Sequence, residues 1–410
     1  MARRQYNSYN DAMLEFIADE LGQLKQSGLY RSLKTITKTD GRMVEINDKQ
    51  YINFCSNNYL GLANHPKVIE ASQQAAKEYG VGAGASRLIC GNLSIHKELE
   101  KKIANFKGRE TAILFPTGYM ANLGAITALV DENDTVIIDR LNHASIIDAC
   151  KLSKAKLQVY PHKDMAALEK ILQRSAKYKK RLIITDSIFS MDGDIASLPE
   201  IVRLAKEFQA LTMIDEAHAT GVLGTRGKGL EEHYGMEGKV DIVMGTLSKA
   251  VGSLGGFIAG SAELIDYLTN KARSFIYTTA LPPSVCAASI AALGIIENEP
   301  ELIKKLRNNI AHLTPLIPLS IFDGEGETRR EGVRIFTPII PIIVGDLQKT
   351  MELSDKLFNA GILAAGIRPP TVPENECRIR LTVSALHTKE DIECLASLLQ
   401  ERTPAAVKPI

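Results

Sequence analysis

The chain has 410 residues, of which 45% are hydrophobic and 24% are charged, and its formal net charge at pH 7 is +1. This composition is that of an ordinary globular protein, long enough for one large domain and a smaller one. The near-zero charge, the absence of Trp and an aromatic content of 6% argue against a nucleic-acid partner, which needs a basic surface or stacking side chains.

The termini and the cysteines bear on the cellular setting. The opening stretch MARRQYNSYNDAML lacks the apolar core of a signal peptide, and the longest apolar runs are too short to cross a membrane. Six scattered cysteines without a CxxC pair fit free thiols in a reducing compartment better than disulfides or a zinc site. We therefore predict a cytoplasmic protein with no membrane contact and no bound metal.

Helices and strands are predicted to alternate over the first three quarters of the chain. A helix is expected from Pro66 to a stop at Gly80. Amphipathic stretches such as 198–209 separate short runs rich in apolar and β-branched residues. These runs are predicted to be buried strands at 111–115, 135–139, 181–187, 210–215 and 240–245. Such alternation predicts an α/β fold with a mostly parallel central sheet and helices on both faces.

The pattern changes after about residue 300. Helices are expected at 302–313 and 347–359, around a β-rich stretch that ends at residue 345. A further β run and a last helix beginning at Thr388 complete a smaller C-terminal α+β domain. A helix near 284–299 is expected to connect the two parts. We predict an N-terminal segment (1–50), a large domain (51–295) and a small domain (296–410).

Polar side chains gather where the predicted parallel strands end, which is where open α/β sheets bind ligands. Singly, each of these residues has an ordinary explanation, such as a helix start for His143 or a surface lysine with a buried stem for Lys249. Together they bring carboxylates, imidazoles, hydroxyls and one amine to a single edge. The residues are Asp139, Asn142, His143, Asp186, Ser187, Asp215, Glu216, His218, Thr246, Ser248 and Lys249.

This set matches the needs of pyridoxal phosphate. The cofactor takes a lysine for a Schiff base, a carboxylate for its pyridinium nitrogen and a cradle for its phosphate. Lys249 and Asp215 supply the first two, and Thr246 and the motif PTGYMAN, between a strand and a helix, supply hydroxyl and N–H donors. Competing motifs are missing, since the sequence has no GxxxxGK[ST], HExxH or GxSxG, and the glycines of YGVGAGASR follow a helix rather than a strand.

Nearly the whole chain resembles the α-oxoamine synthases, a branch of the fold-type I pyridoxal-phosphate enzymes. The resemblance rests on YINFCSNNYLGLANHP, GAGASRLICG, HKELE, LNHASIID, FSMDGDIASLPEI, IDEAHATGVLG, GTLSKAVGSLGG and CRIRLTVSALHT. It implies a fold-type I transferase that condenses an amino acid with an acyl thioester and loses CO2. It also implies a homodimer whose active sites are shared between the subunits.

The resemblance implies roles for the residues around the cofactor ring. Lys249 forms the Schiff base and then acts as a base. Asp215 pairs with the pyridinium nitrogen, while His218 bonds to the ring oxygen. His143 stacks on the ring, and Ser190 helps to position it. Ser190 has an alternative explanation as a simple turn or cap residue.

Other residues are expected at the phosphate. The backbone of Gly118 and Tyr119, with the hydroxyl of Thr246, is expected to hold the phosphate group. Thr278 and Thr279 are expected to reach the phosphate of the partner subunit's cofactor. They could instead cap the helix that follows them.

The substrates are expected to meet polar side chains as well. The resemblance implies that Asn57 and Arg380 bind the amino-acid carboxylate. Arg380 alternates with Arg378 on one strand, so one of the two could be a surface residue. Arg31 is a further candidate, either for a distal carboxylate on the acyl group or as a surface arginine.

Different motifs in the sequence favour two different branches of the family. GIRPPTVPENECRIRLTVSALHT and FSMDGDIASLPEI favour the branch that joins L-alanine to a pimeloyl thioester, carried by coenzyme A or a carrier protein, in biotin biosynthesis. NFCSNNYLGLANHP and LNHASIIDACKLSKAK favour the branch that uses glycine and acetyl-CoA. We favour the first, because the C-terminal motif is expected to line the acyl side of the site. A non-catalytic scaffold subunit is a third hypothesis, and the presence of Lys249, Asp215 and His143 argues against it.

Overall fold

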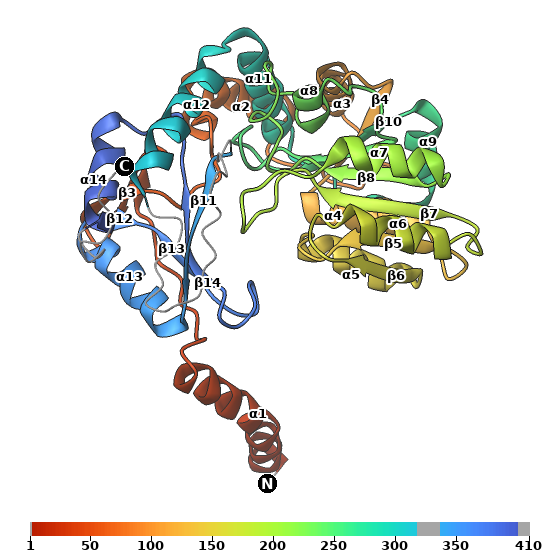
Figure 1. Cartoon of the computed structure of the whole chain (residues 1–410). Coiled ribbons are helices and arrows are strands. Elements are labelled where there is room, and N and C mark those ends of the chain that lie inside the picture. The colour runs from red at the N-terminus through yellow and green to blue at the C-terminus, as the bar shows by residue number, and fades with distance from the viewer. Residues whose placement is uncertain (1, 318–336, 401–410) are drawn as a thin grey trace.

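The computed structural model describes residues 2–317 and 337–400 of the chain. A large sheet with its helices lies beside two smaller sheets, and α2 (Pro66–Tyr79) and α11 (Pro283–Asn298) pack together at their junction (Figure 1). The N-terminal helix α1 (Ala2–Gln26) projects away from this body. No helix among the described residues is long and apolar enough to cross a membrane.

The large sheet has seven strands in the order β4-β10-β9-β8-β7-β5-β6. From β9 to β6 the neighbouring strands are parallel, whereas β10 is antiparallel to both β9 and β4. The strands are β4 (Thr111–Phe115), β5 (Thr135–Asp139), β6 (Lys156–Tyr160), β7 (Arg181–Asp186), β8 (Leu211–Asp215), β9 (Ile242–Thr246) and β10 (Gly256–Gly260). The predicted mostly parallel sheet is confirmed, and β6 and β10 are strands that the sequence analysis did not identify.

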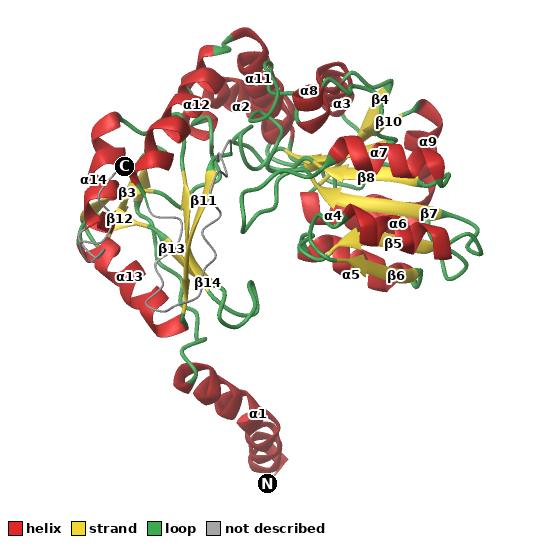
Figure 2. Ribbon diagram, in the orientation of Figure 1, coloured by secondary structure: helices red, strands yellow, loops and turns green. Residues whose placement is uncertain are grey.

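Helices cover both faces of this sheet (Figure 2). Successive residues of a strand point to opposite faces. Val136 and Ile138 accordingly pack with α4 and α5, while Ile137, between them, packs with α6 and α7. These helices are α4 (Gly118–Leu129), α5 (Ala144–Ser153), α6 (Met165–Arg174) and α7 (Leu198–Glu207). The other helices around the large sheet are α3 (Ser94–Lys107), α8 (Leu230–Tyr234), α9 (Ala262–Lys271) and α10 (Arg273–Ile276).

The smaller α+β domain contains two sheets. In the first, β14 (Cys377–Thr382) pairs antiparallel with β11 (Ile339–Gly345) and with β13 (Ala365–Ile367). The second joins the N-terminal strands β1 (Lys38–Thr39), β2 (Met43–Ile46) and β3 (Lys49–Asn53) to β12 (Ile362–Leu363). The helices here are α12 (Glu301–Leu313), α13 (Leu347–Asn359) and α14 (Lys389–Gln400). The boundaries at residues 50 and 295 stay a prediction, and residues 318–336 and 401–410 of the predicted small domain lie outside the described residues.

Local sequence signals set the helix ends that position the site. Helix α2 begins at Pro66 and stops at Gly80, which has a φ of 83°. Thr117 caps α4 by accepting a hydrogen bond from the Met120 N–H (3.1 Å), and the His143 side chain caps α5. Because side-chain caps satisfy only part of the first turn, N–H groups remain free at the start of α4, where β4 has just ended.

The segment after β7 folds back as a short hairpin, residues 187–196, closed by a bridge between Ile188 and Ile195. Gly193 turns it with a φ of 71°, in the left-handed region that glycine adopts without strain. A Cβ at this position would lie 2.1 Å from the carbonyl oxygen of Ile339 in β11. Gly193 therefore allows the hairpin to contact the small domain closely.

We expect Gly193→Ala to lower the free energy of unfolding by more than about 2 kcal/mol, because the left-handed backbone costs ~1–2 kcal/mol and the methyl group must also displace the Ile339 carbonyl. Gly361→Ala is the matched control, since its φ is 86° but a Cβ there has nothing within 4 Å. Denaturant unfolding of both variants measures the difference. Equal losses would show that the close contact at Gly193 is unimportant.

Candidate active site

The carboxyl ends of β5, β7, β8 and β9 meet at one edge of the large sheet, because these strands are parallel. Asp186 and Asp215 are the last residues of β7 and β8, and they are paired with each other in the sheet register. Lys249 is the third residue after the end of β9. Its amine lies close enough to both carboxylates and to Arg380 for their charges to act on it. The predicted cluster is thus assembled from three neighbouring strands and one strand of the small domain.

Asp215 is held in a fixed orientation. Its Oδ2 accepts a hydrogen bond from Asn122 Nδ2 (2.8 Å), and its Oδ1 accepts one from the Ala217 N–H (2.9 Å). The same Asn122 nitrogen, which lies in α4, also donates to Ser145 Oγ in α5 (2.9 Å). The carboxylate is buried, so these contacts define which way its oxygens face.

Asp186 binds the backbone at the start of α5, beside His143. Burial, and then the negative charge of Asp215, raise the pKa of Asp186 well above its ordinary value. Its Oδ2 accepts a hydrogen bond from the backbone N–H of His143 (2.8 Å). Asp186 therefore fixes the start of α5, and with it the place from which the His143 side chain projects.

The two histidines of the cluster differ in environment. The His143 ring is exposed in the single chain, and its Nδ1 lies 2.8 Å from Ser145 Oγ. His218 is buried, and its Nδ1 lies 2.6 Å from Tyr59 Oη. Burial, helped by the positive charges of Lys249 and Arg380, lowers the pKa of His218 well below its ordinary value. His218 is therefore a neutral ring.

A chain of polar contacts leads from His218 to Arg380. Burial raises the pKa of Tyr59 to about 12, so its phenol keeps the proton. Tyr59 Oη lies 3.2 Å from Asn57 Oδ1, which also accepts a hydrogen bond from Arg380 Nη2 (3.2 Å). The ring of His218 and the guanidinium of Arg380 are thus held by the same segment, residues 57–59, which follows β3.

Both arginines of β14 are buried, with exposed fractions of 2% for Arg378 and 7% for Arg380, so neither is a surface residue. Arg378 pairs with the carboxylates of Asp192 (2.9 Å) and Glu376 (3.0 Å). Within residues 2–317 and 337–400, Arg380 has no carboxylate at ion-pair distance. It donates Nε–H to the Ser190 carbonyl (2.6 Å) and one Nη1 proton to Thr382 Oγ1 (3.1 Å). One N–H on each terminal nitrogen remains free for an anion.

The start of α4 forms a cradle beside β9. A Cβ on Gly118 would lie 3.0 Å from Met244 Cε and 3.4 Å from Thr246 Cβ, so the helix end touches the strand. Thr246 Oγ1 donates to the Gly255 carbonyl (2.8 Å) and lies 2.8 Å from Ser248 Oγ. Free N–H groups and hydroxyls at a helix start suit a phosphate. Ser248, one of the polar residues expected at this edge, was not predicted as part of the phosphate cradle.

Several predicted site residues lie outside the cluster in the single chain. The Tyr119 side chain is exposed and bonds to Asp148 (2.5 Å), so only its backbone faces the cradle. Thr279 pairs with Ser86, and no contact between this segment and Lys249 occurs among the described residues. Arg31 is exposed and donates to the carbonyl of Pro369 (2.9 Å). Their roles stay predictions.

Asn122 and Tyr59 orient the cluster but were missing from the predicted set, and Asp186 was predicted at this edge without an assigned role. Asn122, Tyr59 and Asp186 touch Asp215, His218 and His143 respectively. Each lies in a segment that had drawn attention, in PTGYMAN, in NFCSNNYLGLANHP or at a strand end. Their contacts with distant segments were not visible there. No group of three or more His, Cys, Asp or Glu side chains in the described part of the chain is arranged to hold a metal ion.

Comparison with known proteins identifies the family. Residues 49–399 match the family model of the class I and II aminotransferases. The chain belongs to this family. It is 48% identical over 382 residues to an 8-amino-7-oxononanoate synthase of Thermoanaerobacter pseudethanolicus, an alignment that covers 93% of this chain and 94% of the relative.

Solved structures of the family superpose on the chain. Serine palmitoyltransferase from S. paucimobilis matches with a TM-score of 0.87 and 30% identity, covering 95% of this chain and 97% of that one. A structure of 8-amino-7-oxononanoate synthase from Francisella tularensis matches with a TM-score of 0.71 and 28% identity, covering 86% and 97%. These matches confirm the predicted fold-type I transferase fold.

The lowered pKa of His218 predicts an acid-sensitive contribution to the stability of this family member. Below pH 6.5 the unfolded chain protonates this imidazole while the folded chain resists, so the unfolded state binds more protons and stability falls as pH falls. We expect His218→Gln to flatten the slope of unfolding free energy against pH below 6.5, by up to about 1.4 kcal/mol per pH unit. Denaturant unfolding at several pH values measures it, with Tyr234→Phe, away from the cluster, as control. An unchanged slope would mean that His218 is charged in the fold.

Proposed function

We propose that the chain is an 8-amino-7-oxononanoate synthase, a pyridoxal-phosphate-dependent acyltransferase. It joins L-alanine to a pimeloyl thioester and releases CO2 and the free thiol, in biotin biosynthesis. The observation that carries this proposal is the cluster of half-buried Lys249 with buried Asp215, His218 and Arg380 at the carboxyl edge of the sheet. Relatives of that name, 48% identical over more than nine tenths of the chain, support it.

The residues present fit pyridoxal phosphate. When bound, this cofactor supplies a carbonyl carbon that takes up an amine, and a ring that accepts the electron pair left by a departing proton. Asp215, fixed by two hydrogen bonds, would pair with a protonated ring nitrogen, and the start of α4, where a Cβ on Gly118 would crowd Met244 and Thr246, would hold the phosphate. Related solved structures of serine palmitoyltransferase contain pyridoxal phosphate.

Lys249 is suited to move a proton. Burial and the charge of Arg380 lower the pKa of its amine, while Asp215 and Asp186 oppose the shift. A lowered pKa increases the share of neutral amine near neutral pH, and a neutral Nζ can accept a proton from the substrate Cα. Buried Asp215 would favour a proton on the ring nitrogen of the cofactor, and neutral His218 would form a hydrogen bond to the ring oxygen without adding a charge.

Arg380 and Asn57 bind the carboxylate of the amino acid in this proposal. The free N–H groups on the two terminal nitrogens of Arg380 can form paired, charge-assisted hydrogen bonds with one carboxylate. The contacts to Ser190 and Asn57 fix the plane of the guanidinium. A substrate carboxylate bound there lies on the small-domain side of Lys249, so both domains are needed for binding.

Two further arginines fit the distal carboxylate of a pimeloyl group. Arg31 donates to the carbonyl of Pro369 (2.9 Å), and Arg368 donates to the carbonyl of Tyr30 (2.7 Å). These two hydrogen bonds join the N-terminal segment to the segment around Arg368. Burial, and then the charge of Arg31, lower the pKa of Arg368. No ion pair with either arginine occurs in the described part of the chain. Two neighbouring guanidinium groups without a carboxylate attract an anion.

A homodimer with shared active sites is part of the proposal. The segments joined by the Ser86–Thr279 bridge carry large apolar side chains that are exposed in the single chain. These are Val81 (85%), Leu88 (51%), Ile89 (80%) and Tyr277 (72%). An exposed apolar patch of this kind is typical of a protein interface. Thr278 and Thr279 lie within it, where they can reach the site of a partner subunit.

Glycine C-acetyltransferase, which joins glycine to acetyl-CoA, is the alternative that the sequence motifs left open. Arg31 and Arg368, which have no ion pair in the described part of the chain, favour an acyl group with a distal carboxylate over acetyl. A non-catalytic scaffold is disfavoured because Lys249, Asp215 and His143 are all in place. Coenzyme A and an acyl carrier protein both remain candidate carriers of the acyl group, and the cytoplasmic localisation stays a prediction.

A product assay that crosses L-alanine and glycine with pimeloyl-CoA and acetyl-CoA tests the function. We expect 8-amino-7-oxononanoate from L-alanine and pimeloyl-CoA to form fastest, and Lys249→Ala to slow it by at least about 1,000-fold, because covalent attachment and the base are lost together. The rate of product formation, measured by mass spectrometry, distinguishes these outcomes. Faster reaction of glycine with acetyl-CoA would favour the alternative, and undiminished turnover by Lys249→Ala would overturn the mechanism.

Arg368→Met tests the acyl side of the site. We expect the KM for pimeloyl-CoA to rise about 10- to 100-fold, the effect of losing a charge-assisted hydrogen bond of ~1.5–3 kcal/mol, with the KM for L-alanine unchanged. Heptanoyl-CoA, which has the same length but no distal carboxylate, is the matched control substrate. If Arg368→Met impairs both thioesters equally, the arginine does not recognise the carboxylate.

A further inference from the structure

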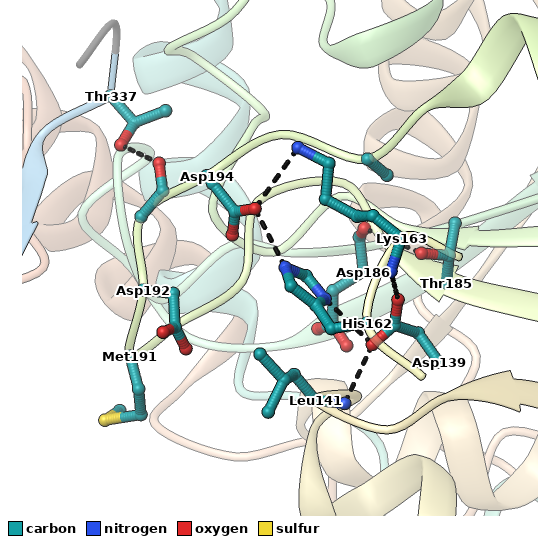
Figure 3. A network of polar contacts seen from close by, with 12 residues as sticks. Asp139, Leu141, His162, Lys163, Thr185, Asp186, Met191, Asp192, Asp194 and Thr337 are labelled. Atoms are coloured by element: carbon teal, nitrogen blue, oxygen red, sulfur yellow. Dashed lines mark hydrogen bonds and ion pairs between the residues drawn. The ribbon is translucent and has the colours of Figure 1, made fainter. Parts of the chain in front are cut away.

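His162 lies outside the cluster and bridges two carboxylates. It follows β6, and its Nδ1 lies 3.0 Å from Asp139 Oδ1 while its Nε2 lies 2.8 Å from Asp194 Oδ2 (Figure 3). Two carboxylate acceptors require both ring nitrogens to donate, so the ring carries a positive charge. Burial opposes this charge, but the hydrogen bonds to Asp139 and Asp194 outweigh it and raise the pKa of His162 to about 9.

One end of this bridge is anchored in the large sheet. Asp139 is the last residue of β5 and is buried. It also accepts hydrogen bonds from the N–H groups of Leu141 and Lys163, both at 2.9 Å. Lys163 has a φ of 56°, a strained backbone that persists only where surrounding contacts impose it. Asp139 and the chain after β6 therefore form a rigid base for the His162 ring.

The other end of the bridge lies in the hairpin of residues 187–196. Asp194 is fixed there by the hydrogen bond from the Phe189 N–H to its carbonyl (3.1 Å), and the Phe189 ring lies edge-on to His162. Lys163 Nζ also contacts Asp194 Oδ2 (3.2 Å), but its side chain is 35% exposed, so it adds little. His162, whose side chain is 13% exposed, therefore links the hairpin to the end of β5, in addition to the bond from the Ser187 N–H to the Asp215 carbonyl of β8 (2.9 Å).

The opposite side of the same hairpin contacts the small domain. Arg378 pairs with Asp192, and Thr337 Oγ1 donates to the Gly193 carbonyl (2.5 Å). The Ser190 carbonyl accepts from Arg380 Nε (2.6 Å). Arg380 is thus oriented by a turn whose other strand is fastened to the sheet through His162. A shift of the hairpin moves the carbonyl that sets the plane of the guanidinium.

We propose that His162 is a positioning residue, which clamps the hairpin between Asp139 and Asp194 and thereby sets Arg380 for the carboxylate of the amino-acid substrate. The inference rests on the proposed role of Arg380. Apart from its two carboxylate partners, the ionisable side chains drawn around His162 are Lys163, Asp186 at the end of β7, and Asp192 in the hairpin (Figure 3). Lys163 joins the same two carboxylates through its N–H and its Nζ, but its side chain is 35% exposed, so His162, at 13%, supplies the less exposed link.

Two substitutions of His162 by uncharged amides test the two hydrogen bonds of the ring one at a time. In His162→Gln the amide nitrogen reaches the place of Nε2 and keeps the bond to Asp194, whereas in His162→Asn it reaches the place of Nδ1 and keeps only the bond to Asp139. We expect His162→Asn to raise the KM for L-alanine about tenfold, the effect of losing a charge-assisted hydrogen bond. The KM for pimeloyl-CoA stays within about twofold, and His162→Gln lies between His162→Asn and wild type.

Lys180→Met is the matched control, because Lys180 pairs with buried Asp134 (2.9 Å) immediately before β5, at the opposite end of the strand that Asp139 terminates. It removes an ion pair from the same strand, and we expect it to leave the KM for L-alanine unchanged. The ratio of this KM in His162→Asn to that in wild type should approach one as the pH passes 9, where wild type loses the charged ring. Equal KM values for His162→Asn and Lys180→Met would overturn the proposal.

Hydrogen exchange gives a readout that does not depend on turnover. Amides of residues 188–195 should exchange faster in His162→Asn than in Lys180→Met or wild type, and unchanged exchange there overturns the clamp. Faster exchange with an unchanged KM would reduce His162 to a structural contact and overturn its positioning role. Failure of the proposed function has a different signature, since wild type would then show no turnover of L-alanine while the exchange experiment still reports on the clamp.

Discussion

The burial of charge at the carboxyl edge of the large sheet is the constraint on which the rest of the structure depends. Asp215 and Arg380 are buried, and the half-buried Lys249 brings its desolvated amine to the same place, where an ion without partners costs several kcal/mol. Each is stabilised by groups from other elements, such as Asn122 of α4 for Asp215 and the Ser190 carbonyl for Arg380. The strand order, the start of α4 and the place of β14 are therefore all required before any one of these charges is tolerated.

Local patterns predicted the parts of this arrangement that depend on neighbouring residues. The ends of β8 and β9 were visible because each is a short buried run followed by polar residues, and parallel pairing then brings Asp215 and Lys249 to one edge. In contrast, β10 has glycine at both ends and three apolar residues between them, and the edge strand β6 is half exposed. Neither has enough apolar residues for its pattern to predict a strand.

Contacts between distant segments could not be predicted from local patterns. Asn57 and Arg380 are 323 positions apart, and Tyr59 and His218 are 159 apart. Nothing in the strand pattern distinguishes Arg378 from Arg380, because both lie on the same face. The hairpin after β7 offers the Asp192 carboxylate to Arg378 and the Ser190 carbonyl to Arg380. His162 was equally inconspicuous, since its two partners follow different strands.

The pairing of β3 with β12 has a consequence for how the chain is made. The strands of the large sheet lie between residues 111 and 260, so this sheet can form while the ribosome is still adding the small domain. Strands β1 to β3 emerge first but receive their last neighbour only when Ile362 and Leu363 have been synthesised. Until then β3 has an unpaired edge, a feature that favours association with other chains. The sheet of β1 to β3, made before the large sheet, is thus completed after it.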